Sequence, residues 1–179
     1  MSEKQQKTRS SFIKSHTAGY LLGLLLFVIG IPALMWWISG RGVHYFPDST
    51  ILCIIACICC LFGLSLSIYT IVYMKKVGQG NPFDAYGHEI APRTRCLMTQ
   101  GPYRLCRNPM LVGIYIYDIG ILLFLWTWWP LLIFAIEVIL LSIQVRSEEK
   151  RLEADFGETY LNYKKSVGRY LPFRLKKKK

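Results

Sequence analysis

The chain has 179 residues, of which 53% are hydrophobic and 14% aromatic, and it carries 22 Lys and Arg against 11 Asp and Glu, for a net charge of +11. A mean hydropathy of +0.30 beside a pI near 9.5 indicates that apolar and basic residues are segregated, which excludes a disordered tail protein and disfavours an ordinary soluble domain. Four membrane spans of ~20 residues would use about 80 positions, which leaves no room for a separate doubly wound cofactor domain of ~100 residues. Any cofactor site must therefore be built by the membrane domain itself.

Four apolar stretches predict membrane-spanning helices. Residues 18–38 and 51–74 contain no charge, and each stretch is long enough to cross ~30 Å of hydrocarbon. Residues 110–125 and 130–145 flank a Trp-rich turn, which indicates a helical hairpin with its turn at the membrane interface. A single re-entrant hairpin is the alternative. We expect an all-α, polytopic membrane protein with about four transmembrane helices.

The distribution of basic residues predicts the orientation in the membrane. Residues 1–17 hold four basic and one acidic side chain, residues 75–107 hold six and two, and residues 146–179 hold eleven and five. This pattern places the N-terminus, the long loop and the C-terminal tail in the cytoplasm, in the cell membrane of a bacterium or the endoplasmic reticulum of a eukaryote. The basic excess then serves contact with anionic lipid, and no nucleic-acid partner is expected.

The tail after the fourth stretch predicts an amphipathic cytoplasmic helix. Five apolar residues follow one another at spacings of four, four, three and four and so share one helical face: Leu152, Phe156, Tyr160, Tyr163 and Val167. Charged residues cover the other side, which predicts a helix on the membrane surface that bends at Gly157. Residues 174–179, which end in the lysine run at 176–179, form a separate basic terminus.

The six cysteines predict neither a metal site nor a disulfide. Four of them lie inside the uncharged second span without His or carboxylate partners: Cys53, Cys57, Cys59 and Cys60. Cys96 and Cys106 lie in the predicted cytoplasmic loop, where thiols usually stay reduced.

Two cytoplasmic stretches carry more Gly, Pro, Arg and Glu than simple connectors need. The first is GPYRLCRNP at 101–109, which enters the third span, and the second is RSEE at 146–149, which leaves the fourth. Because the hairpin is antiparallel, its two cytoplasmic ends lie side by side. We therefore expect both stretches to meet in one site at the membrane surface.

These stretches also carry a family resemblance. GPYRLCRNPMLVG at 101–113, followed after a hydrophobic hairpin by EEKRLEADFGETYLNYKKSVGRYLPF at 148–173, resembles the superfamily of isoprenylcysteine carboxyl methyltransferases and phospholipid methyltransferases. The resemblance covers roughly residues 75–173, which we take as a methyltransferase-like core behind the tail at 1–17 and the first two helices at 18–74. It implies a membrane enzyme that transfers a methyl group from S-adenosylmethionine to a lipid-soluble acceptor, with the cofactor held between loop and tail.

The resemblance also implies roles for individual residues. The positions that match the cofactor-associated motifs are Gly101, Pro102, Tyr103, Arg107, Asn108, Glu148 and Glu149. Arg104 and Arg107 are the expected catalytic residues. Asn108 and Leu111 depart from the family, which often has His and Tyr there, and this puts any role carried over from those two side chains in doubt.

The acceptor is left open by the residues. A carboxylate is already nucleophilic at pH 7 and mainly needs an arginine to aim it, which suits Arg104 and Arg107, whereas an amine must first lose a proton to a base such as Asp118 or Glu137. Two other functions compete with methyl transfer. One is an NADPH-dependent sterol or enone reductase, which has a similar GPY–RxP segment, and the other is a non-catalytic membrane adaptor.

Asp118 and Glu137 are the two charged residues of the predicted hairpin interior. A hairpin that turns about position 127.5 places residues at equal depth when their numbers sum to 255, as 118 and 137 do. An ionised carboxylate at mid-membrane costs at least ~2.5–3.5 kcal/mol, so we expect the two side chains to avoid lipid. At least one should be protonated, either hydrogen-bonded to the other or to polar groups in a cavity.

Overall fold

The computed structural model describes residues 23–40, 47–78 and 96–172, and within these ranges the regular secondary structure is helical throughout. The predicted N-terminal tail, the start of the first span, most of the long cytoplasmic loop and the lysine-rich terminus lie outside the described residues.

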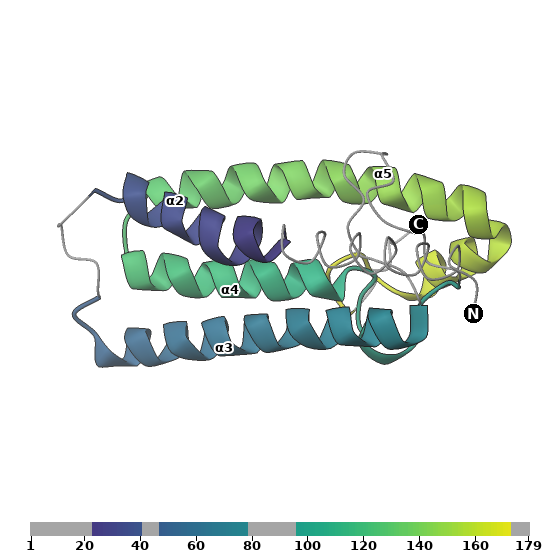
Figure 1. Ribbon diagram of the computed structural model, residues 1–179, viewed down its shortest axis with the longest axis horizontal. Coiled ribbons are helices and arrows are strands. Elements are labelled where there is room, and N and C mark those ends of the chain that lie inside the picture. The colour runs from purple at the N-terminus through teal and green to yellow at the C-terminus, as the bar shows by residue number, and fades with distance from the viewer. Residues whose placement is uncertain (1–22, 41–46, 79–95, 173–179) are drawn as a thin grey trace, which may run out of the picture.

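The described residues form a bundle of four helical segments (Figure 1). Their bounds are α2 at Ile31–Ile38, preceded by a π-helical segment at Leu24–Gly30, α3 at Thr50–Tyr73, continued as a π-helix over Met74–Gly78, α4 at Pro109–Leu125 and α5 at Trp129–Ser166. Two helical stretches are long and apolar enough to cross a membrane, Thr50–Val77 and Trp129–Ser166, and two shorter apolar helices cover Leu25–Ile38 and Pro109–Leu125.

Glycines hold α3 and α4 in close contact along the length of α4. A Cβ added to Gly63 would lie 2.5 Å from the Gly113 carbonyl oxygen, and one added to Gly120 would lie 2.5 Å from the Cys60 sulfur. Side chains also bridge the pair, since Ser67 donates a hydrogen bond of 3.1 Å to the Met110 carbonyl. Small residues at the interface allow such backbone approach, which is how membrane helices pack where no water is available to drive association.

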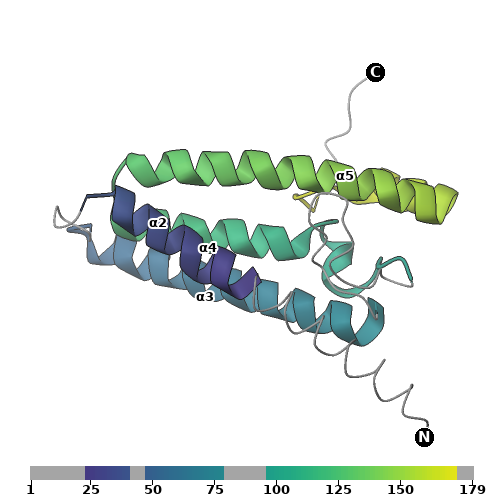
Figure 2. The same ribbon diagram turned by 45° about the horizontal axis from the view of Figure 1, so that its top comes forward.

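The Trp-rich turn joins α4 to α5 as the sequence predicts. Trp126 ends α4 in the left-handed region with φ 43°, and Pro130 stands in the first turn of α5, where its missing N–H costs nothing. At this end of the bundle Met35 of α2 packs against Leu125 and Ile133, so α2 contacts both legs of the hairpin (Figures 1 and 2).

The prediction that the two hairpin carboxyl groups avoid lipid is confirmed. Asp118 and Glu137 are 0% and 4% exposed, and the two carboxyl groups lie close enough to act on each other electrostatically. No donor from any other described residue reaches either group. The sharing of one proton by the two acids stays a prediction, because none of their four carboxyl oxygens has a hydrogen-bond partner among the described residues.

The fourth predicted span runs into the tail helix without a break near residue 146, and α5 is interrupted at Gly157 instead. No Gly or Pro occurs between 131 and 156, so nothing interrupts α5 until Gly157, whose φ of 53° and ψ of −129° reverse the chain. The predicted bend at Gly157 is therefore confirmed, and Figure 1 shows the last part of α5 folding back beneath the rest of α5 at one end of the bundle. The predicted apolar face packs on protein: Tyr160 and Tyr163 are buried with Met74, Met98 and Tyr103, and Leu152, Phe156 and Val167 pack around them.

Candidate active site

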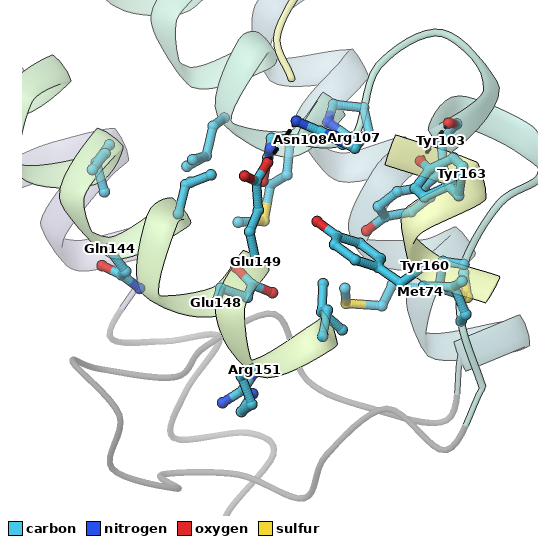
Figure 3. A pocket seen from close by; sticks show the side chains of 18 residues that line it. Met74, Tyr103, Arg107, Asn108, Gln144, Glu148, Glu149, Arg151, Tyr160 and Tyr163 are labelled. Atoms are coloured by element: carbon cyan, nitrogen blue, oxygen red, sulfur yellow. Dashed lines mark hydrogen bonds and ion pairs between the residues drawn. The ribbon is translucent and has the colours of Figure 1, made fainter. Parts of the chain in front are cut away.

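A pocket lies where the start of α4, the middle of α5 and the folded-back end of α5 meet (Figure 3). One part of its wall is polar and is built by Arg107, Asn108, Glu148 and Glu149. The part that extends between α4 and α5 is apolar and is built by Met110, Leu111, Leu141 and Val145. The two sequence stretches that were expected to meet thus form one amphiphilic pocket.

The 101–109 stretch forms a short 3-10 helix at Gly101–Arg104, followed by a loop into α4. Gly101 has φ +60°, and a Cβ there would lie 2.5 Å from the ring of Tyr73. A side chain at this position would therefore be strained and would also clash. The glycine lets the turn close on α3 and so sets the direction in which Tyr103 and Arg107 leave the loop.

Glu149 is the centre of the ionic contacts in the pocket. Its Oε1 lies 2.8 Å from an Arg107 guanidinium nitrogen, and Arg169 donates to both of its carboxylate oxygens, at 3.0 and 2.6 Å. The Glu149 side chain is 6% exposed, and the bidentate contact raises the pKa of Arg169. One buried carboxylate therefore binds the loop before α4 to the chain beyond α5, through the fork geometry that favours arginine.

The chain after α5 returns along the loop as a strap, which we define as residues 167–172. Its carbonyl oxygens accept hydrogen bonds from two backbone N–H groups, Arg107 to Gly168 at 2.9 Å and Asn108 to Arg169 at 3.1 Å. The Asn108 side chain donates a further bond of 3.3 Å to the Arg169 carbonyl.

The strap continues past these bonds into the space between α4 and α5. Its Tyr170 reaches the Ser142 hydroxyl at 3.3 Å, and its ring lies 5.8 Å from that of Tyr115. The strap therefore contacts both legs of the hairpin beside the pocket.

Three tyrosines close the side of the pocket opposite the hairpin. Tyr163 donates a hydrogen bond of 2.7 Å to the Tyr103 carbonyl, and the rings of Tyr160 and Tyr163 meet edge to face at 6.2 Å. Burial raises the pKa of all three phenols, so their hydroxyls stay protonated at neutral pH.

Glu148 differs from its neighbour in every contact. It is partly exposed along the pocket wall, and it makes no ion pair or hydrogen bond within the described part of the chain. Burial and the charge of Glu149 raise its pKa to about 7. Figure 3 shows the Glu149 side chain directed toward Arg107, whereas the Glu148 side chain is directed away from that guanidinium.

The structure brings together five of the predicted site residues and leaves three outside. Tyr103, Arg107, Asn108, Glu148 and Glu149 line the pocket. Gly101 and Pro102 shape the turn without lining it, and Arg104 is exposed and lines a separate shallow hollow with Thr99 and Asn162. Leu111 and Asn108, the two departures from the family pattern, both line the pocket.

Sequence reasoning assigned no role to Arg169, although it lies in the tail segment that carries the resemblance. Its contribution depends on a strap that folds back across about sixty residues of chain, and no periodic pattern signals such a pairing. Gln144 and Arg151, about one helical turn before and after Glu148, also line the pocket without having been singled out. Among the residues that the structure describes, no group of His, Cys, Asp and Glu is arranged to hold a metal ion.

These features describe a helical membrane protein with an amphiphilic pocket at one end of its bundle. The family model for phospholipid methyltransferases matches residues 51–159, which is more than half of the chain and includes most of the pocket. The protein belongs to this methyltransferase family. A comparison with curated proteins finds no match, and neither does a comparison with solved structures.

Proposed function

We propose that the protein uses S-adenosylmethionine to methylate an amine-bearing membrane lipid in this pocket. The observation that carries the proposal is the junction of a polar wall with an apolar wall that runs between α4 and α5. A methyl donor with a charged amino acid end fits the first, and an acceptor with long hydrocarbon chains fits the second. Membrane proteins of this kind place the site where a lipid reaches it without leaving the bilayer.

The residues present fit the cofactor. The Arg107 Nε is buried and has no hydrogen-bond partner within the described residues, so it is a donor available to a carboxylate such as that of the cofactor's amino acid end. When bound, the cofactor supplies an electrophilic methyl group on a sulfonium. Glu149 would act on the bound cofactor only indirectly, by orienting the Arg107 guanidinium.

The charges in the pocket favour an amine over a carboxylate as acceptor. An isoprenylcysteine carboxylate would need a cationic partner of its own, but Arg104 lies outside the pocket, Arg169 is bound to Glu149, and Arg107 would be shared between Glu149 and the carboxylate of the proposed cofactor. A carboxylate acceptor would also meet Glu148. A protonated amine is attracted by the same charge.

We further propose that the chain crosses the membrane four times, with both termini cytoplasmic and the basic end of the bundle resting on anionic lipid. The two shorter apolar helices, α4 and the stretch that ends in α2, supply the crossings that length alone does not establish. Hydrophobic stretches shorter than the bilayer are accommodated by local thinning or by packing with longer neighbours.

Calorimetric titration of the protein in detergent with S-adenosylmethionine, and with NADPH alongside, tests the proposed cofactor. Arg107→Gln should weaken S-adenosylmethionine binding by ~1–3 kcal/mol, the range for losing a hydrogen bond to a charged group. Arg104→Gln is the matched control, because this arginine is three positions away and outside the pocket. Binding of NADPH alone, or equal affinity in both variants, would contradict the proposal.

A further inference from the structure

We propose that Glu148 is the proton acceptor for the amine that is methylated, and that Glu149 positions the loop and strap. This assignment rests on the proposed function, since it takes an amine lipid as the acceptor. It separates two adjacent glutamates that sequence matching treats as one cofactor-binding pair.

Contacts separate the two side chains first. Glu149 is engaged by Arg107, by both donors of Arg169 and, at 4.0 Å, by Lys164, so its lone pairs are used within the protein. A carboxylate held by two guanidiniums is a poor base, because taking up a proton would break those contacts. Glu148 lines the same pocket and forms no such contact within the described residues.

The surroundings of Glu148 suit a group that must gain and lose a proton. The titratable groups that influence it or are influenced by it are the neighbouring carboxylate of Glu149 and the buried phenols of Tyr103 and Tyr160, and the arginines Arg107 and Arg151 line the same pocket. Both phenols stay neutral, and Arg107 is neutralised by Glu149. Burial and the charge of Glu149 raise the pKa of Glu148 to about 7, close to the range in which a general base is efficient at neutral pH.

The step balances as follows. The Glu148 carboxylate removes one proton from the ammonium group of the lipid, which frees the nitrogen lone pair. That lone pair forms the new N–C bond to the methyl carbon while the C–S bond breaks, and the bonding electron pair stays on sulfur, so the sulfonium becomes a neutral thioether. Glu148, now a carboxylic acid, is partly exposed and returns its proton to water.

The position of Glu148 in the pocket agrees with this role. It stands one turn of α5 beyond Gln144 and Val145, where the apolar wall ends and the polar wall begins. A lipid whose chains lie along Leu111, Leu141 and Val145 would present its headgroup at this boundary.

The test compares Glu148→Gln, Glu148→Asp and the exposed control Glu158→Gln, which lies outside the pocket. Two quantities are measured on each full-length variant in detergent: calorimetric affinity for S-adenosylmethionine, and the single-turnover rate of methyl transfer to phosphatidylethanolamine between pH 5.5 and 9. Glu148→Gln should bind the cofactor within about twofold of the parent but transfer the methyl group ~10²–10⁴-fold more slowly, the usual range for a general base. The parent rate should fall below pH 7, Glu148→Asp should keep this fall at a lower rate, and Glu148→Gln should lose it.

Some outcomes would contradict the role of Glu148 and leave the proposed function standing, and one would contradict the proposed function itself. A tenfold loss of cofactor affinity in Glu148→Gln with an unchanged pH profile would make Glu148 a cofactor ligand. Transfer to a prenylcysteine carboxylate instead of the amine would refute the base but keep the methyltransferase. A parent protein that binds no S-adenosylmethionine would refute the proposed function itself.

Discussion

Glu149 illustrates how much of the site depends on one side chain. It is buried between Arg107 and Arg169, which come from segments more than sixty residues apart in sequence, and its loss leaves two guanidiniums facing each other. Removing one partner from a buried ion pair leaves an uncompensated charge and the desolvation cost of bringing it there.

Glu149→Gln should therefore lower the stability of the protein by about 2–3 kcal/mol, less than the ~3–5 of a fully buried pair because Arg169 is partly exposed. Thermal unfolding in detergent measures the effect. The control is Glu153→Gln, whose partner Lys164 is half in solvent, and which should cost under ~1 kcal/mol. Equal losses in the two variants would show that the Glu149 contacts carry no special weight.

Replacing Glu148 should change the stability of the protein in the opposite direction, by an amount that depends on pH. Its pKa is raised from 4.5 to about 7 in the folded protein, so the folded state binds more protons than the unfolded state between these values, and stability falls as the pH rises through this window. Glu148→Gln should remove that loss. We expect its melting temperature to match the parent near pH 4.5 and to exceed it above pH 7, by an amount worth ~1–2 kcal/mol after allowance for partial exposure.

A melting temperature of Glu148→Gln that lies below the parent at pH 8 would show that Glu148 is ionised at no cost. Such a result would weaken its assignment as the base. A gain in stability together with a loss of transfer rate is the trade-off expected where an active-site residue is kept in an unfavourable environment.

At the scale of the helices, the hairpin of α4 and α5 buries a pair of carboxyl groups between its legs. Asp118 and Glu137 are buried, face each other and receive no donor from any other described residue. Asp118→Asn keeps a hydrogen-bonding group of the same size, and we expect a change under ~1 kcal/mol. Asp118→Leu leaves Glu137 without a partner in an apolar setting and should cost ~1–3 kcal/mol, measured as a lower melting temperature in detergent. Unchanged melting of Asp118→Leu would remove the pair from the interactions that hold the hairpin.

This pair also marks what sequence could predict. The equal depth of Asp118 and Glu137 in the hairpin followed from the position of the Trp-rich turn alone. The meeting of the 101–109 loop with Glu148 and Glu149 followed from the antiparallel arrangement of the hairpin. Both are consequences of helix geometry, which is local and regular. The continuity of α5 across residue 146 was missed because the change from apolar to charged residues there suggests a boundary, although no residue at that point breaks a helix.

What sequence could not supply is the direction of individual side chains in irregular segments. Arg104 and Arg107 are three residues apart, yet one is exposed and the other lines the pocket, because the 3-10 turn and loop are oriented by contacts with Tyr73 and the strap. The different duties of Glu148 and Glu149 depend on the same strap. Its hydrogen bonds join residues about sixty positions apart, and tertiary contacts of this kind leave no periodic signal in the chain.

On the scale of the whole molecule, the two ends of the bundle differ in chemistry. The pocket end gathers the basic side chains of the described residues: Lys75, Lys76, Arg104, Arg107, Arg146, Lys150, Arg151, Lys164, Lys165 and Arg169. The opposite end carries tryptophans, and within the described residues its one charged side chain is Asp48. Large apolar side chains are exposed on the helices between the ends, for example Ile58 at 60% and Ile139 at 59%. This distribution supports the proposed orientation, with the basic pocket end toward the cytoplasm and the tryptophans at the opposite interface.

The orientation predicts which positions react with a membrane-impermeant maleimide in intact cells. In a variant whose six cysteines are replaced, a single cysteine is introduced by Trp128→Cys, by Lys150→Cys or by Ile139→Cys. Trp128 is 85% exposed at the turn and should react from outside, whereas Lys150 is exposed at the pocket end and should react only after permeabilisation. Ile139 is 59% exposed in the protein, but lipid should cover it, so it should not react in either condition until detergent is added.

Labelling of Lys150→Cys from outside would invert the orientation and place the pocket on the other side of the membrane. Labelling of Ile139→Cys without detergent would instead show that α5 faces water along its middle, which would contradict the membrane span and not just its direction.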